Sequence, residues 1–299
     1  MSFRLAASKE VEVIELRPVG VDAFEDVYPL LVGFRNRRTS KEDWRRMLFT
    51  YPWTDEPRRG YAVYSDGKAI GFLGTILSKR TWGGRVERVC NLSTWIVDRG
   101  YPNASILLTR PVLAEMDGYT IVGFTPSPMS CAVFARLGFR TFETEQMLLL
   151  PLPHPIEALR SLAGSIAISR DVLDQELRDE ELAIHRDHAG SRAVGVLLRR
   201  KDTQCYLVAR TDRRKHLPVA ELLYIGDREF FWQNRFLAHA VLFYALGAVG
   251  LVVDRRFAEG RRGPHALRLE RTRIFRPSRP DITPMAIDGL YSELVMLRE

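Results

Sequence analysis

Cysteine is scarce in this sequence, and long apolar runs are missing from it. The three cysteines, Cys90, Cys131 and Cys205, are far apart, odd in number and without the spacing of metal ligands, which argues against a disulfide framework and against a zinc site. No segment reaches the roughly 18 apolar residues of a membrane-spanning helix, and residues 1–16 contain no apolar core of a signal peptide. We therefore expect a cytoplasmic protein that needs no metal and no membrane.

The sequence also has no basic tail. Its 44 Lys and Arg exceed its 37 Asp and Glu, and the formal net charge is +7, spread over both halves of the chain. An excess of this size suits an anionic small molecule, such as a nucleotide cofactor, at least as well as nucleic acid, and is equally compatible with an ordinary solvated surface. Since no helix concentrates Arg with exposed aromatic residues, we do not expect a nucleic-acid-binding module.

The composition is that of a globular protein, with 46% hydrophobic and 27% charged residues. A chain of 299 residues suits two domains. The Pro-rich stretch "PLPHPIEALRSLAGS" at 151–165 interrupts the regular patterns near the middle. We place the boundary there, which predicts domains at 1–152 and 153–299.

The first half predicts a mixed sheet. Strands are expected at 11–19, 60–66, 68–82, 85–98, 119–127 and 140–152, and helices at 22–37, 40–53, 103–117 and 128–139. The turns "SDGK" and "WGGR" indicate hairpins, and Ser40 suits the N-cap of the second helix. A meander followed by a strand–helix–strand crossover predicts a parallel pair at the centre of the sheet.

The second half repeats this order in outline. We expect helices at 169–190 and 231–247 and strands at 193–200, 205–212, 217–227, 250–254 and 289–297. The Arg-rich segment 255–276 suits either a solvated hairpin or a surface for an acidic acceptor. His185 and His188 lie three apart on a helix with no third ligand in sight, which predicts a surface pair. The fold class is therefore α/β, with two similar domains in tandem.

Residues 97–108, "VDRGYPNASILL", join an apolar strand to a helix through a tight turn. Unpaired backbone N–H groups and the helix dipole at such a junction favour a phosphate. Gly100 permits a close turn, Pro102 lacks an N–H, and Asn103 or Ser105 suits the N-cap. The alternative is an ordinary strand-to-helix turn.

This junction resembles the cofactor motif of the GNAT superfamily of acyl-CoA-dependent N-acyltransferases, which runs Arg/Gln-x-x-Gly-x-Gly/Ala after a long fourth strand. "RGYPNA" matches it with Arg99 and Ala104 in register, and Pro102 stands at a position where the motif usually has Gly. The segment "SPMSCAVFARLGFR" at 127–140 resembles a second signature of the family. Ser127 stands at its Asn position and Phe134 at its Tyr position.

The resemblance implies a GNAT fold and direct attack of an amine on the thioester of acetyl-CoA or another acyl-CoA. Backbone groups near Ile96 and Val97 would face the pantetheine. Arg99 and the turn would hold the pyrophosphate. The implied cofactor-binding residues are Ile96, Val97, Arg99, Gly100, Tyr101, Asn103, Ala104, Ser105, Ser127 and Phe134.

For the catalytic base, the strand at 85–95 offers Glu87 and Asn91, which share one face. Phe134 replaces the Tyr that often serves as the acid in the family and cannot donate a proton. Asp227 and Glu229 would repel phosphate at the equivalent junction of the second half. The second domain is therefore expected to complete the acceptor cleft or to be structural.

The leading interpretation is an N-acetyltransferase acting on an amine of a small molecule or sugar-like metabolite, as a monomer or homodimer. Two alternatives remain open. One is a transferase of similar tandem fold that uses aminoacyl-tRNA. The other is a GNAT-like module that binds acyl-CoA or a protein without catalysis.

Overall fold

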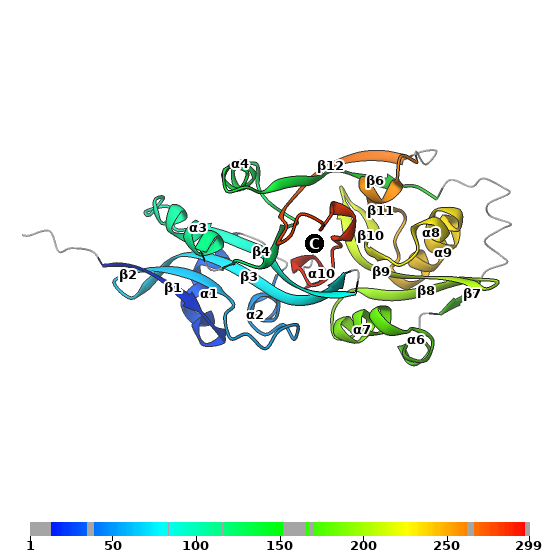
Figure 1. Cartoon of the computed structure of the whole chain (residues 1–299), viewed down its shortest axis with the longest axis horizontal. Coiled ribbons are helices and arrows are strands. Elements are labelled where there is room, and N and C mark those ends of the chain that lie inside the picture. Colours follow the sequence, from blue (N-terminus) through cyan, green and yellow to red (C-terminus); the bar gives the residue numbers. More distant parts are fainter. Residues whose placement is uncertain are drawn as a thin grey trace, which may run out of the picture.

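The computed structural model describes residues 13–34, 39–82, 84–114, 116–151, 165–167, 170–261 and 266–296. Most of the Pro-rich joint therefore lies outside the described residues. The first half contains the strands and helices expected from its sequence (Figure 1). They are β1 (Ile14–Val19), η1 (Val21–Ala23), α1 (Phe24–Val32), α2 (Lys41–Leu48), β2 (Gly60–Ser65), β3 (Lys68–Trp82), β4 (Arg85–Val97), α3 (Ala104–Ala114), β5 (Tyr119–Gly123), α4 (Pro128–Arg136) and β6 (Arg140–Leu149).

The N-cap predicted at Ser40 is confirmed. Its hydroxyl accepts from the backbone N–H of Asp43, and the Asp43 carboxylate accepts from the Ser40 N–H in return, which forms a capping box.

The second half runs from a short strand to a short helix. Its elements are β7 (Ser165–Ala167), α6 (Arg170–Glu176), α7 (Asp179–His188), β8 (Val194–Arg200), β9 (Thr203–Arg214), β10 (Leu217–Ile225), α8 (Arg228–Gln233), α9 (Arg235–Leu246), β11 (Leu251–Asp254), η2 (Arg255–Ala258), β12 (Ala266–Arg276), η3 (Pro284–Ala286) and α10 (Glu293–Met296).

The twelve strands of the described residues form one mixed sheet in the order β1-β2-β3-β4-β5-β12-β6-β11-β10-β9-β8-β7. Read inward from either edge, five strands of one half are followed by the sixth strand of the other half. β12 thus pairs with β5 and β6, and β6 also pairs with β11. The parallel pairs are β4–β5 and β10–β11. The predicted mixed sheet with a parallel pair is confirmed, whereas the domain boundary at residue 152 stays a prediction.

The strand expected at 289–297 is wrong. Tyr291 has φ 53°, which interrupts an extended chain, and the Ser292 hydroxyl accepts the Leu294 N–H as α10 begins. Leu294, Val295 and Met296 of this segment are buried in a helical turn instead. A short apolar run fits a buried helix as well as a strand, and its pattern cannot distinguish the two.

The solvated hairpin, one of the two alternatives for 255–276, is also wrong. Most of this segment is η2 and the exchanged strand β12. Arg273 is buried, the Arg256 side chain is 8% exposed, and both pair with the Asp254 carboxylate. Arginine at these positions therefore serves internal ion pairs, which a count of charges along the sequence does not reveal.

The surface pair expected at His185 and His188 is wrong as well. Both imidazoles are buried between α7 and the sheet, where His185 contacts the Tyr206 hydroxyl and His188 donates to the Ile184 carbonyl. Burial lowers the pKa of His188 to about 4, so the ring is neutral near pH 7.

The helices cover both faces of the sheet. One hydrophobic core joins α1, α2, α6, α7 and α10 to a single face across both halves (Figure 1). On the opposite face, α3 and α4 cover the first half, and α8 and α9 cover the second. This arrangement places the junctions after β4 and β5 between two layers of helices.

Candidate active site

The centre of the first half contains a gap between parallel strands. β4 pairs with β5 only over Arg88–Asn91, opposite Tyr119–Val122. Beyond Asn91, β4 continues for six residues to Val97 beside β3 alone. The two strands therefore diverge at Asn91, and the sheet opens at this point.

A β-bulge changes the direction of β4 inside this gap. Ser93 pairs with Gly74 and Ile96 pairs with Phe72, so Thr94 and Trp95 together face one residue of β3. Thr94 takes φ 60°, a rare conformation for a β-branched residue. Such bulges redirect side chains, and here Ser93, Thr94 and Trp95 all turn toward the gap.

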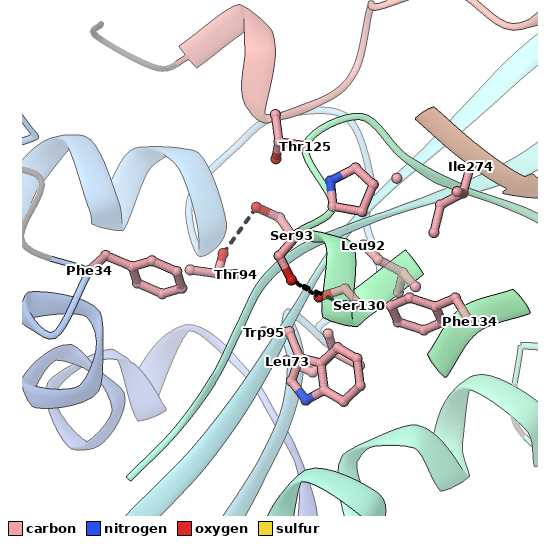
Figure 2. Close-up of a pocket in the computed structure, with 13 residues that line it drawn as sticks. Phe34, Leu73, Leu92, Ser93, Thr94, Trp95, Thr125, Ser130, Phe134 and Ile274 are labelled. Carbon is pink, nitrogen blue, oxygen red and sulfur yellow. Dashed lines mark hydrogen bonds between the residues drawn. The ribbon is translucent and has the colours of Figure 1, made fainter. Parts of the chain in front are cut away.

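A cavity of about 160 Å³ occupies the gap (Figure 2). Phe34, after α1, belongs to one face of the sheet, because it packs on Trp44 of the core there. Phe134, on α4, belongs to the core of the opposite face. The cavity thus passes through the sheet between β4 and β5. Its walls are Phe34, Leu73, Leu92, Ser93, Thr94, Trp95, Gly123, Thr125, Pro126, Ser127, Ser130, Phe134 and Ile274.

The turn after β4 is closed by its own hydrogen bonds. The Gly100 N–H donates to Asp98 Oδ1 at 2.9 Å, and the Tyr101 N–H donates to the Asp98 carbonyl at 2.9 Å. The N–H groups of Ala104 and Ser105 likewise donate to backbone carbonyls of the turn. A carboxylate therefore occupies part of the position at which the sequence predicts a pyrophosphate.

No family model matches the chain, and no curated protein matches its sequence. Solved structures do match its fold. A GCN5-related N-acetyltransferase from Kribbella flavida has a TM-score of 0.57 at 14% identity, covering 89% of this chain and 71% of its own. One from Anabaena variabilis has a TM-score of 0.58 at 11% identity, covering 89% and 73%. The chain has the GNAT fold.

A third GNAT structure matches most of this chain but a smaller part of its own. It is the GCN5-related glucosamine N-acetyltransferase region of a fungal multi-domain GH3 β-N-acetylglucosaminidase, with a TM-score of 0.58 and 13% identity. The match covers 91% of this chain and 39% of that one. The structural similarity establishes the GNAT fold. Because the sequence identities are so low, the chemistry has to be inferred from the residues of the site.

The cofactor residues predicted from the GNAT motifs fall into two groups. Ser127 and Phe134 line the cavity. Ser127 caps α4 by accepting the Ser130 N–H, and Phe134 packs against Trp95 with ring centroids 5.1 Å apart. The others do not line it but lie at the end of β4 and in the following turn. They are Ile96, Val97, Arg99, Gly100, Tyr101, Asn103, Ala104 and Ser105.

The predicted base residues, Glu87 and Asn91, have separate surroundings. Glu87 lies near the start of β4, where Arg279 pairs with its carboxylate at 2.7 Å and Ser278 donates to it. Asn91 is fully buried at the point where β4 and β5 diverge. Neither side chain lines the cavity of this GNAT fold.

The structure places beside the cavity one carboxylate that the sequence analysis did not predict. Glu293 of α10 is 2% exposed and accepts from the Thr125 hydroxyl at 2.8 Å and from the Asn91 side-chain amide. Thr125 is itself a wall residue of the cavity. Glu293 lies 202 residues from Asn91 in the sequence, so no local motif connects the two.

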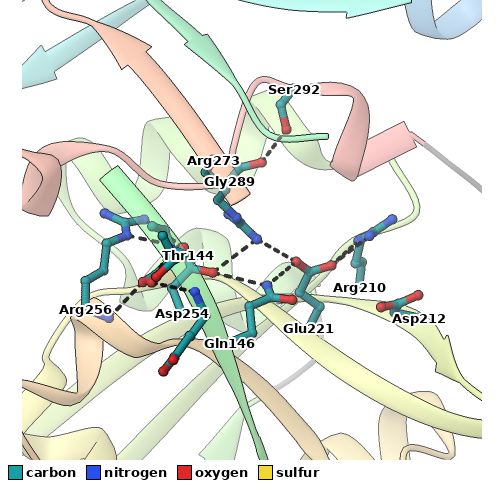
Figure 3. Close-up of polar contacts among 12 residues, drawn as sticks. Thr144, Gln146, Arg210, Asp212, Glu221, Asp254, Arg256, Arg273, Gly289 and Ser292 are labelled. Carbon is teal, nitrogen blue, oxygen red and sulfur yellow. Dashed lines mark hydrogen bonds and ion pairs between the residues drawn. The ribbon is translucent and has the colours of Figure 1, made fainter. Parts of the chain in front are cut away.

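In the second half, charged side chains surround the place where β10 and β11 diverge (Figure 3). β10 and β11 pair only at Ala220 and Glu221, and Glu221 accepts from Gln146 and from two arginines there. Burial raises the pKa of Glu221, but Arg210 and Arg273 outweigh it and hold that pKa well below its ordinary value. This network fixes the exchanged strands β6 and β12 to β10.

Three further findings concern metal ligands, membrane helices and the Cys131 thiol. Over the parts of the chain that the structure describes, no three or more His, Cys, Asp or Glu side chains are grouped to hold a metal ion. Within the same residues, no helix has the length and apolar character needed to cross a membrane. Burial raises the pKa of the Cys131 thiol on α4, which favours its uncharged form.

Proposed function

We propose that this protein is an acyl-CoA-dependent N-acyltransferase, most simply an acetyltransferase, acting on the amine of a small molecule or sugar-like metabolite. The cavity between β4 and β5 carries the proposal. It passes through the sheet, so a thioester entering from the α4 face meets an acceptor on the α1 face. Holding both reactants in this geometry lowers the entropic cost of the reaction.

Each face of the cavity has a role in this mechanism. Ser127 and Ser130, whose hydroxyls lie 2.8 Å apart, border the pantetheine side together with Phe134. The bulge at Thr94 and Trp95 supplies backbone groups near the thioester carbonyl. Arg99 and the exposed part of the turn contact the pyrophosphate. Phe134 donates no proton, so the thiolate leaves with help from water or from these serines.

The proposal extends to the rest of the molecule. The first domain, 1–152, binds the acyl-CoA, and the second, 153–299, completes the acceptor cleft or is structural, which the charged network at Glu221 supports. Cys90 and Cys205 are buried free thiols, which suits a reducing cytoplasm. The working state is a monomer or a homodimer.

Calorimetric titration with acetyl-CoA tests the proposal. We expect micromolar binding to the wild type and a loss of at least tenfold in Arg99→Glu, because the reversed charge repels the pyrophosphate. Arg213→Glu is the matched control, since Arg213 is exposed on β9 and changes the net charge equally. Undetectable binding to the wild type would reject the proposal.

A second candidate is a GNAT-like module that binds without catalysis. Phe134 favours it, because a phenyl ring at the position of the family's usual acid cannot donate a proton to the leaving thiolate. Binding of acetyl-CoA without acyl transfer to any amine would support this candidate. No binding at all would favour a different donor, such as aminoacyl-tRNA.

A further inference from the structure

The hydrogen bonds around Glu293 have a fixed direction. A carboxylate only accepts, so the Thr125 hydroxyl must donate its proton to Glu293 Oε1. The lone pairs of Thr125 Oγ1 remain available to a group inside the cavity, whose wall Thr125 forms. The threonine oxygen can therefore accept a proton from the cavity while it passes its own proton to Glu293.

Asn91 holds the other carboxylate oxygen in place. Its side-chain amide donates to Glu293 Oε2, and its own Oδ1 has no hydrogen-bond partner among the described residues although Asn91 is fully buried. A buried amide oxygen without a partner costs stability. This arrangement keeps a carboxylate 2% exposed at the point where β4 and β5 diverge.

We propose that Thr125 and Glu293 form the proton relay that deprotonates the acceptor amine. This inference rests on the proposed function. Thr125 is the catalytic residue, because its hydroxyl touches the amine. Glu293 acts through Thr125, and Asn91 is a positioning residue. The predicted base Glu87 has no part in the relay, since its carboxylate already pairs with Arg279.

The reaction balances without a further reactant. The acceptor ammonium gives one proton to Thr125 Oγ1 as the Thr125 proton moves to Glu293. The amine lone pair then forms the C–N bond to the thioester carbon, and the C–S bond breaks with its electron pair going to the thiolate. The nitrogen loses its second proton. One of the two protons ends on the thiol and the other in solvent.

Steady-state kinetics with acetyl-CoA test the relay, using glucosamine as a charged amine and hydroxylamine as a nucleophile that is uncharged at neutral pH. Thiol release gives the rate, and mass spectrometry identifies the acetylated product. With glucosamine at pH 7, Glu293→Gln should lower kcat by about 10²- to 10⁴-fold. The KM for acetyl-CoA should stay unchanged, because Glu293 does not contact the donor.

Two readouts separate a relay from a structural role. In Glu293→Gln the rate should recover as pH rises toward the range in which the free amine dominates, and hydroxylamine should lose much less rate than glucosamine. Thr125→Val should behave like Glu293→Gln, whereas Thr125→Ser should retain most of the activity. Because Thr125 is exposed, its variants keep the test valid even if a Glu293 variant unfolds.

Glu143→Gln is the matched control, since Glu143 is buried on β6 and accepts backbone N–H groups away from the cavity. Its kcat should remain within a few-fold of the wild type. Full activity of Thr125→Val at pH 7, in a protein that binds and uses acetyl-CoA, would overturn the relay alone. A wild type that transfers acetyl to neither probe would overturn the proposed function, and the relay would fall with it.

Discussion

At the scale of single residues, we expect Asp98 to control the affinity of the turn after β4 for an anion. Its carboxylate accepts the Gly100 N–H at 2.9 Å beside Arg99. We predict that Asp98→Asn binds CoA several-fold more tightly, because the amide oxygen keeps this hydrogen bond while the negative charge is removed. Calorimetric titration at low salt measures the change.

The matched control for this prediction is Asp202→Asn, which removes the same charge at an exposed turn between β8 and β9. Its CoA affinity should equal that of the wild type. Equal affinities of Asp98→Asn and the wild type would show that the pyrophosphate lies elsewhere.

The sequence predicts part of the candidate site at this scale. Ser127 and Phe134 follow from a local motif, because their spacing is set by a single helix. Glu293 could not be found in this way, since its partners Asn91 and Thr125 lie 202 and 168 residues away. Only a fold that returns the C-terminal segment to the centre of the sheet brings the three together.

At the scale of secondary structure, the bulge in β4 places Thr94 in a strained conformation, with φ 60°. We predict that Thr94→Gly leaves the free energy of unfolding unchanged or raises it by about 1 kcal/mol, because glycine takes this conformation without strain. Thr81→Gly, on the regular part of β3, should instead lose up to about 1 kcal/mol. Denaturant unfolding of both variants measures the difference, and an equal loss in both would contradict the prediction.

The elements of the first half follow from the sequence because turns and caps mark their ends. "SDGK" and "WGGR" join β2, β3 and β4 as hairpins, and the capping box at Ser40 opens α2. β12 and α10 were missed for a different reason. Arg273 of β12 looks solvated in the sequence, and only the other strands place Glu221 and Asp254 beside it.

At the scale of the whole molecule, buried histidines link stability to pH. Burial lowers the pKa of both His188 and His239 to about 4, from an ordinary 6.5. Between these values the unfolded chain binds protons that the folded chain does not, so stability falls as pH decreases from 6.5 to 4. The loss reaches about 3 kcal/mol for each histidine below pH 4.

Urea unfolding between pH 7.5 and 4 measures this dependence. His188→Gln should have a shallower slope than the wild type in this range, whatever its stability at pH 7.5. His216→Gln, which removes an exposed imidazole, should keep the wild-type slope. A wild-type stability that stays constant from pH 7 to 5 would contradict the buried neutral state.

The exchange of β6 and β12 also affects how the chain folds during synthesis. When β5 has left the ribosome, its partner β12 is still more than a hundred residues from being made. At ordinary translation speeds this delay is on the order of ten seconds. During that time β5 presents an open edge that β12 of another nascent chain can fill. The contacts that join the two halves of one molecule can thus also produce a strand-swapped dimer on a crowded polysome.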